Sequence, residues 1–198
     1  MVGDVVEPDI HPTCEKCGWV IGTEAIELPP EPAKPIKLDI GCGNAKPDGW
    51  TGLDRIEYPG VDILWDFNRM PWPLKEYSVS EARAHHVIEH IPRVTFERRR
   101  VGEREFNITY YPFIKFMDEV WAVLVPSGQF HIMYPPAGSE AFYQDPTHCN
   151  PCNFKTWKYF DPEIDNGFFY QCYAPRPWKL VSKSVDSILM HYVVLEKR

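Results

Sequence analysis

Long hydrophobic runs, an excess of basic residues and an N-terminal targeting pattern are all absent from this sequence. No apolar run approaches the roughly 20 residues that a membrane-spanning helix needs. The first residues, Met1 to Asp4, contain neither a basic cluster nor an apolar segment, so we expect no secretory signal and a cytoplasmic protein. The 21 basic residues are outnumbered by 28 acidic ones, which gives a net charge of −7. This balance argues against a protein whose main role is to bind nucleic-acid phosphate.

Proline and aromatic residues, by contrast, are plentiful. The 198 residues include 20 prolines, and the first 35 residues contain six of them together with seven acidic residues and only two lysines. Hydrophobic residues make up 44% of the chain, which suits one domain with a buried core. Because proline favours extended backbone, Leu28–Pro35 is a natural boundary. The sequence therefore predicts an acidic, proline-rich arm over residues 1–35 and one folded domain over residues 36–198.

The spacing of apolar residues predicts several short strands and one long helix. Apolar residues from Phe113 to Leu124 recur at i, i+3, i+4, i+7, i+8 and i+11, and Pro126-Ser127-Gly128 should end this helix. Strands alternating with helical segments indicate an α/β fold with a mostly parallel sheet, to which the last two strands add an antiparallel hairpin. The expected strands cover residues 36–40, 50–54, 61–65, 80–86, 129–134, 178–186 and 188–196.

The strongest local motif is Leu38-Asp39-Ile40-Gly41-Cys42-Gly43-Asn44, in which a buried strand runs into a glycine turn. Ligands of open α/β sheets bind at the carboxyl ends of the strands, where a glycine turn lets them approach the backbone. The G-x-G-x-x-G pattern of dinucleotide-binding proteins fails, because Lys46 stands at the third glycine position. The next two strands end on Asp54 and Asp66, and Phe67-Asn68 follows. These strand ends are expected to surround one adenosine, although a glycine turn without a ligand remains the alternative.

These segments resemble, in order, the motifs of class I S-adenosylmethionine-dependent methyltransferases, and within that class a small branch written around L-x-x-G-C-G-N. The matching segments are Leu38–Asn44, Asp62–Asn68, Met70–Pro73, His86–Ile91, Glu119–Gly128 and Phe142–His148. The last of these is similar to the D-P-T-H insertion of some members. Val125 and Ser127 stand where the branch usually has Lys and Gly, which indicates a divergent member.

The resemblance covers the chain from about residue 36 to its end. It implies a Rossmann-like methyltransferase sandwich with S-adenosylmethionine as cofactor, and it says little about the acceptor. The cofactor-binding residues that it implies are Asp39, Gly41, Cys42, Gly43, Asp54, Asp66, Phe67, Asn68 and His86.

Candidate catalytic side chains lie in two of these segments. Asp145 and His148 are expected on the acceptor side and His86 beside the cofactor, while Asp145-Pro146-Thr147 as a simple turn is the alternative. A general base is needed only if the acceptor atom carries a proton at the working pH. His86, Glu89 and His90 also have a metal-binding spacing, in the inverted H-x-x-E-H order of some zinc proteases. Their place after the fourth strand argues against a protease, and a purely structural role for Glu89 and His90 is the alternative.

Two C-x-x-C pairs are candidate zinc ligands, Cys14 with Cys17 and Cys149 with Cys152. A structural Cys₄ site needs both pairs in one place. The pairs lie far apart in the sequence whereas typical sites are local, so free thiols are the alternative. The cluster Arg98-Arg99-Arg100 with Arg104 is either part of a solvated loop or a clamp for an anionic acceptor.

The sequence thus predicts an enzyme that transfers a methyl group from S-adenosylmethionine to a small-molecule or glycan-like acceptor, and the acceptor class rests on the resemblance alone. Tyr134-Pro135-Pro136 follows the fifth expected strand and not the fourth, which argues against a base-flipping DNA amino-methyltransferase. The alternative from another class is a catalytically inactive module with the same fold, stabilised by zinc, that binds or scaffolds a partner. The two hypotheses differ in whether an adenosine pocket is open beside the glycine turn.

Overall fold

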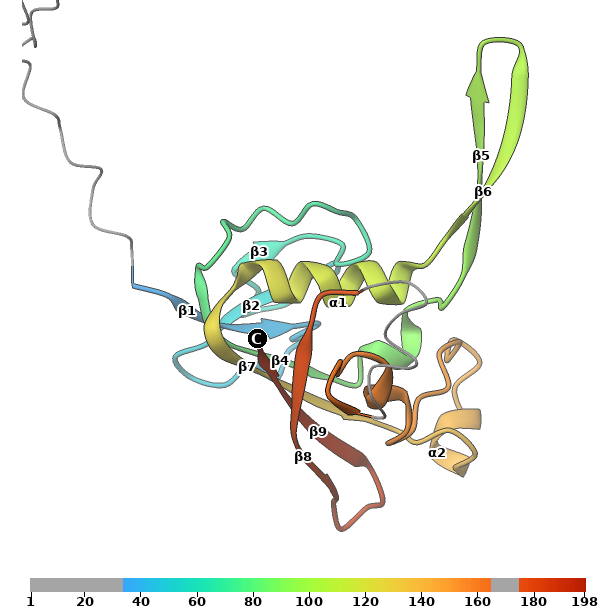
Figure 1. Ribbon diagram of the computed structural model, residues 1–198. Coiled ribbons are helices and arrows are strands. Elements are labelled where there is room, and N and C mark those ends of the chain that lie inside the picture. Colours follow the sequence, from blue (N-terminus) through green and yellow to red (C-terminus); the bar gives the residue numbers. More distant parts are fainter. Residues whose placement is uncertain (1–33, 165–174) are drawn as a thin grey trace, which may run out of the picture. The chain divides into compact units, whose positions relative to one another are not determined.

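Seven strands form one mixed sheet in the computed structural model, which describes residues 34–164 and 175–198 (Figure 1). Their order is β3-β2-β1-β4-β7-β9-β8, in which the first five are parallel and the last two antiparallel. The strands are β1 (Ile36–Ile40), β2 (Thr51–Asp54), β3 (Ile63–Leu64), β4 (Val79–His85), β7 (Leu124–Tyr134), β8 (Trp178–Val185) and β9 (His191–Lys197). This architecture confirms the expected α/β fold with a C-terminal antiparallel hairpin.

The sheet has one apolar and one more polar face within the described residues. On β4, Ala82 and Ala84 are buried, whereas Arg83 between them is partly exposed. The helix α1 (Pro112–Val123) packs on the apolar face, where its Phe116 contacts Phe130 of β7 ring to ring at 6.3 Å (Figure 1). Strands of a parallel sheet covered by helices on both faces are apolar along their whole length. The alternation along β4 therefore reflects a sheet with two different faces.

The junction between α1 and β7 differs from the expectation. The predicted helix is confirmed, but it ends at Val123, and β7 starts at once with Leu124. Pro126-Ser127-Gly128 therefore lies inside the strand and does not end the helix. The pairing of β4 with β7 shifts register at this segment, and Ser127 adopts a left-handed φ of 60°. These turn-forming residues make a local irregularity in β7 because β4 and β9 pair with the strand beyond it.

A hairpin occupies the long connection before α1. Strands β5 (Thr95–Val101) and β6 (Arg104–Tyr110) pair with each other, and the hairpin stands away from the seven-stranded sheet (Figure 1). Arg98 and Arg104 are exposed on it, so the solvated loop expected here is in fact a solvated hairpin. Charged residues on both strands obscure the apolar alternation by which a strand is usually recognised.

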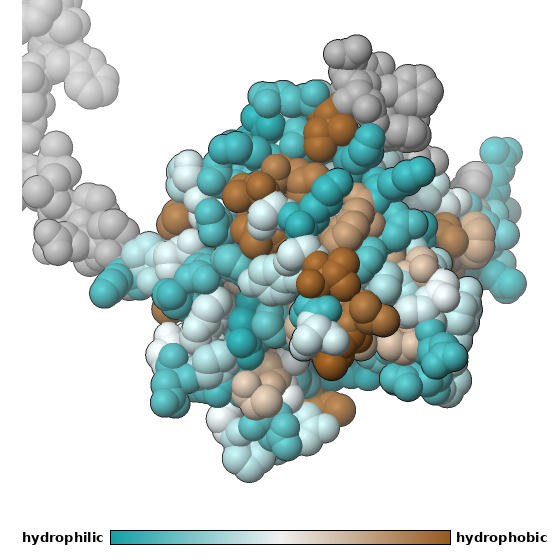
Figure 2. All heavy atoms as spheres, turned by 90° about the horizontal axis from the view of Figure 1, so that it is seen from below, coloured by the Kyte–Doolittle hydropathy of each residue, from teal (hydrophilic) through white to brown (hydrophobic). Residues whose placement is uncertain are grey.

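Short helical segments complete the described structure. They are α2 (Glu140–Tyr143) and two 3₁₀ turns, Ile88–His90 and Thr156–Tyr159. Within residues 34–164 and 175–198, no helix has the length and apolar character needed to cross a lipid bilayer. On the face shown in Figure 2, hydrophobic residues form narrow groups among hydrophilic ones. Small exposed apolar groups of this kind are normal on a protein surface.

Candidate active site

The glycine turn after β1 forms the floor of a cleft at the carboxyl ends of the parallel strands. Gly41 and Gly43 have left-handed φ values of 65° and 53°, which residues with a side chain adopt at a cost. A Cβ on Gly41 would lie 2.5 Å from Cγ2 of Val87, whereas one on Gly43 would meet nothing within 4 Å. Gly41 is thus required for packing as well, and the turn remains open to a ligand at Gly43.

Asp54, at the end of β2, holds this turn in place. Its Oδ2 accepts a hydrogen bond from the Gly43 N–H at 2.8 Å, and its Oδ1 accepts one from the Ile56 N–H at 2.9 Å. The side chain also lines the cleft, together with Gly41, Phe67 and His86. Each carboxylate oxygen has a second lone pair. Asp54 can therefore accept further hydrogen bonds from a ligand in the cleft.

Of the three expected cofactor residues after β3, Phe67 lines the cleft, whereas Asp66 and Asn68 do not. Phe67 is buried, lines the cleft and packs edge-on against Phe116 at 6.2 Å. Asp66 is exposed, and its Oδ1 accepts hydrogen bonds from the backbone N–H of Asn68 at 2.9 Å and from its Nδ2 at 3.2 Å. Asp66 and Asn68 thus form a local turn that presents Phe67 to the cleft.

Two of the expected cofactor residues use their side chains elsewhere. Asp39 is 1% exposed and makes a two-pronged ion pair with Arg83, with both N–O distances at 2.8 Å. The buried Cys42 packs towards β2, since a Cβ on Gly52 would lie 2.6 Å from its sulfur. Burial raises the pKa of the Cys42 thiol to about 11. Neither side chain lines the cleft, so only their main-chain atoms remain candidates for ligand contact.

His86 follows β4 directly and lines the cleft, and because β1 lies between β2 and β4 in the sheet, His86 and Asp54 flank the strand that ends in the glycine turn. Its φ of 56° is left-handed, and its N–H donates to the carbonyl of Met133 at 2.9 Å. Nδ1 lies 3.3 Å from Oε1 of Glu89, and this carboxylate raises the pKa of His86. Strained left-handed residues are concentrated at functional sites, because the surrounding structure must hold them. The position of His86 fits that pattern.

The segment after α2 is joined to the 3₁₀ turn that follows His86. The backbone N–H groups of Cys149 and Asn150 donate to the carbonyl of Glu89 at 2.8 and 3.0 Å. Nδ2 of Asn150 donates to the carbonyl of Ile88 at 2.9 Å, and its Oδ1 accepts from Nε of Arg93 at 2.6 Å. These main-chain bonds bring the Asp145–His148 segment beside the cleft.

Asp145 and His148 lie at the rim, and the residue between them reaches the cleft. Thr147 lines the cleft, and its hydroxyl donates to Oδ1 of Asp145 at 2.7 Å. Bonds from the Thr147 hydroxyl and N–H lower the pKa of Asp145. His90 also lines the cleft, with Nδ1 2.9 Å from the Thr147 hydroxyl oxygen. Thr147 was missing from the sequence-based candidates, whereas His90 was considered as a metal ligand in the H-x-x-E-H spacing, with a structural role as the alternative. The D-P-T-H segment was the available signal for Thr147, and the His86–Ile91 segment was the signal for His90.

His86 and His90 do not share one face of an α-helix, although their i, i+4 spacing would allow it. Residues 88–90 form a 3₁₀ turn, so the i, i+4 argument does not hold. His90 instead lies beside His148, with ring centroids 4.7 Å apart.

The cysteine pairs are only partly within the described residues. Cys149 is exposed, whereas Cys152 is 1% exposed with its sulfur 3.9 Å from the Arg93 guanidinium. Burial raises the pKa of the Cys152 thiol to about 11. Cys14 and Cys17 lie outside residues 34–164 and 175–198. The four-cysteine zinc site therefore stays a prediction.

Two cavities among the described residues differ in size and position. The cleft at the strand ends has a volume of about 170 Å³, which is below the roughly 300–1,000 Å³ of a typical ligand pocket. A larger cavity of about 680 Å³ lies between the start of α1 and residues 151–160, and it includes none of the predicted site residues. The cleft is the relevant one, because the glycine turn and the strand ends meet there.

Among comparisons with known proteins, only that with solved structures found matches, and these concern the fold. No family model matches the chain, and no curated protein sequence does. A methyltransferase of Archaeoglobus fulgidus that depends on S-adenosylmethionine is similar in structure, with a TM-score of 0.51, 16% identity, and 84% of this chain and 87% of that one covered. The YcgJ protein of Bacillus subtilis has a TM-score of 0.50 and 12% identity, with 84% and 93% covered.

A third similar structure contains ligands. It is a 1,6-didemethyltoxoflavin N1-methyltransferase of Burkholderia thailandensis with its substrate and S-adenosylhomocysteine bound. Its TM-score is 0.50 at 13% identity, with 83% of this chain and 72% of that one covered. At these identities the likeness shows a shared fold, which is that of class I methyltransferases.

Proposed function

We propose that the protein is a methyltransferase that uses S-adenosylmethionine and acts on a small-molecule or glycan-like acceptor. The observation that carries this proposal is the cleft itself. An open glycine turn, the carboxylate of Asp54 and the ring of Phe67 converge at the carboxyl ends of β1, β2 and β3, and His86 and Thr147 also line the cleft. Fold and cleft together fit an adenosine-containing cofactor.

Each part of the cleft has a distinct task in binding. The free lone pairs of Asp54 would accept hydrogen bonds from ribose hydroxyls. The turn at Gly43 has open space on its outer side, so a ligand can approach the backbone closely. Phe67 offers an apolar surface for an adenine ring. None of these groups depends on the side chain of Asp39 or Cys42.

Methyl transfer from this cofactor mainly requires the protein to position the acceptor. When bound, S-adenosylmethionine supplies an activated methyl group. The chain must align the acceptor with that methyl group and keep water away. In this proposal the acceptor would approach from the side of Asp145 and His148, beside the cleft-lining Thr147, and the imidazole of His86 is the candidate base within the cleft. The bound substrate of the Burkholderia thailandensis enzyme, a small molecule, supports the acceptor class.

Thermal-shift titration with S-adenosylhomocysteine tests the proposal. At 100 times its dissociation constant, a ligand stabilises a protein by about 2.7 kcal/mol, which raises the melting temperature measurably. Asp54→Asn should weaken binding about tenfold or more, because its amide would place a donor against the N–H of Gly43 or Ile56. Glu57→Gln removes the same charge from an exposed neighbour and should bind like the wild type.

Two results decide between an enzyme and an inactive module. A shift with S-adenosylhomocysteine that Asp54→Asn abolishes supports the enzyme. No shift at millimolar ligand in the wild type favours the catalytically inactive module.

A further inference from the structure

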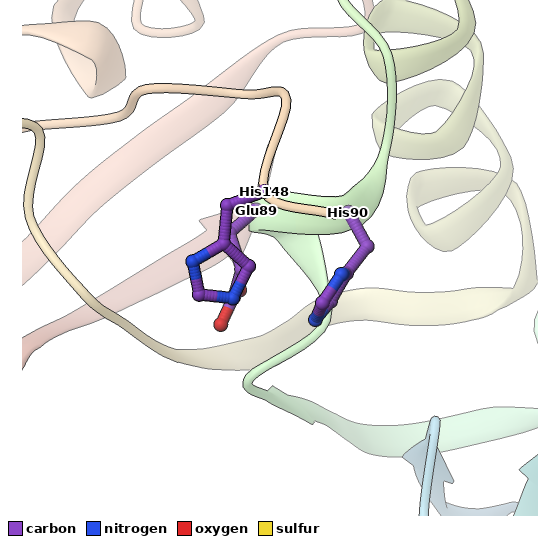
Figure 3. Close-up of side chains that lie close together, drawn as sticks. All are labelled: Glu89, His90 and His148. Carbon is purple, nitrogen blue, oxygen red and sulfur yellow. The ribbon is translucent and has the colours of Figure 1, made fainter. Parts of the chain in front are cut away.

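Three side chains of types that bind metal ions lie close together beside the cleft. Ligand atoms of Glu89, His90 and His148 all lie within 4.8 Å of one another. Figure 3 shows the ring of His148 over the Glu89 carboxylate, with the ring of His90 beside them. The set joins two chain segments, the 3₁₀ turn after β4 and the D-P-T-H segment.

Glu89 is the most unusual member. Its side chain is 1% exposed, and neither carboxylate oxygen has a hydrogen-bond partner in the part of the chain that the structure describes. Nδ1 of His86 lies 3.3 Å from Oε1, beyond the roughly 2.7–2.9 Å of a charge-assisted hydrogen bond. A buried carboxylate that lacks hydrogen bonds is costly even with an imidazole 3.3 Å away. A positively charged ligand at this point would remove that cost.

The hydrogen bonds of His90 determine which of its nitrogens is available. The hydroxyl of Thr147 donates its single proton to Oδ1 of Asp145, so its oxygen can only accept from His90. His90 therefore carries its proton on Nδ1, and Nε2 keeps a free lone pair. Metal-ligating histidines show this arrangement, with the second ring N–H held by an outer partner.

His148 has the same arrangement from a different partner. Its Nδ1 lies 2.8 Å from the backbone carbonyl oxygen of Phe142, which can only accept. The proton is thus on Nδ1, and the lone pair is on Nε2, which lies 3.7 Å from Oδ2 of Asp145, beyond hydrogen-bond distance. The side chain is 8% exposed, and its neighbours Cys149 and Asn150 are bonded to the carbonyl of Glu89. The two imidazoles and the carboxylate are consequently presented from a connected backbone.

We propose that Glu89, His90 and His148 bind one divalent transition-metal cation of the Zn²⁺ and Co²⁺ class. Two imidazoles and one carboxylate form a donor set that such cations use in sites with open positions. Ligands at about 2.0–2.2 Å from a cation lie roughly 3–4 Å from one another. The cluster therefore needs only a small contraction to close on the ion.

The open coordination positions of the cation would let it bind and activate the acceptor, an inference that rests on the proposed function. His90 lines the cleft, so the ion lies where the acceptor must enter. An acceptor hydroxyl bound to the ion has a lowered pKa and releases its proton to solvent. Its oxygen then forms the new bond to the methyl carbon, and the electron pair of the broken carbon–sulfur bond stays on sulfur. The acceptor class is accordingly one with a metal-binding oxygen.

Cobalt(II) titration of the chelator-treated full chain tests the site without any cofactor present. Nitrogen and oxygen ligands give weak visible absorption bands, whereas thiolates add an intense near-ultraviolet band, so the cysteine pairs are read separately. We expect visible bands that saturate at one equivalent. Glu89→Gln and His148→Gln should each weaken binding at least tenfold. His131→Gln is the matched control and should bind like the wild type, because its imidazole contacts Tyr192 and Glu81 outside the cluster.

The outcomes separate this proposal from the proposed function. No visible bands at millimolar cobalt overturn the metal site, and so does unchanged binding in both ligand variants. Circular dichroism checks that each variant is folded, and if Glu89→Gln is not, His148→Gln decides. Thermal shifts with S-adenosylhomocysteine on the same samples report the cofactor cleft independently. Cobalt binding without a cofactor shift retains the metal site and rejects the methyltransferase.

Discussion

Gly41 and Gly43 stand two residues apart in one turn, yet their replacement by alanine should have unequal effects. Both have left-handed φ values, 65° and 53°. A Cβ on Gly41 would lie 2.5 Å from Cγ2 of Val87, which is itself buried, whereas a Cβ on Gly43 would meet nothing within 4 Å. Gly43→Ala therefore tests the backbone cost alone, and Gly41→Ala tests that cost plus the clash.

The magnitudes follow from these two contributions. A left-handed conformation costs an alanine roughly 1–2 kcal/mol. Overpacking a well-filled site adds about 1–3 kcal/mol. Gly43→Ala should thus lower the free energy of unfolding by about 1–2 kcal/mol and Gly41→Ala by about 2–5 kcal/mol. For a domain of this size, each kcal/mol corresponds to about 2–4 °C in melting temperature.

Urea unfolding of four variants measures these terms. They are the two single glycine variants, Val87→Ala and the double variant Gly41→Ala with Val87→Ala. Removing the methyl groups of Val87 relieves the clash, so the double variant should be more stable than additivity predicts by about 1 kcal/mol or more. The reasoning is refuted if Gly41→Ala costs no more than Gly43→Ala, or if the double variant is simply additive.

Three further predictions concern charge and reactivity. Arg83→Met leaves Asp39 buried and unpaired, so it should lower the free energy of unfolding by about 3 kcal/mol. Adding Asp39→Asn should recover part of the loss. Equal stability of the single and the double variant in urea would contradict this. The pKa of His86 is raised above 6.5 by the neighbouring carboxylate, so its stabilising effect is complete below pH 6.5 and is lost as the pH rises through the folded-state pKa. The stability difference between wild type and His86→Gln should therefore shrink with rising pH, and a constant difference across a urea series would count against the contact. Cys149 should be alkylated by iodoacetamide before Cys152, which is buried with a pKa of about 11, and mass spectrometry that found equal rates in the folded chain would contradict that burial.

The turn and strand features of the fold were predictable because their signals are local. Apolar spacing identified α1, and the glycine turn with the acid at Asp54 identified the cleft. The hairpin of β5 and β6 was not predicted, because charged residues occupy both of its strands. The exact start of β7 also escaped prediction, since pairing with β4 and β9 prevails over the turn-forming residues Pro126-Ser127-Gly128.

Side-chain partners across the sheet were beyond the reach of the sequence. Asp39 was expected at the cofactor because it precedes the glycine turn, but its carboxylate meets Arg83 on the neighbouring strand. The register between β1 and β4 decides that contact, and a register depends on pairing with another strand.

The sequence by itself determined the α/β fold class, the glycine turn and the acid beside it, because periodicity and backbone conformation are properties of neighbouring residues. Only the tertiary structure decided that His90 and His148 meet beside Glu89. That meeting depends on the backbone N–H groups of residues 149 and 150 reaching the carbonyl of Glu89, about 60 positions away in the chain. Main-chain hydrogen bonds of this kind carry no residue signature, so they become visible only once the chain has folded.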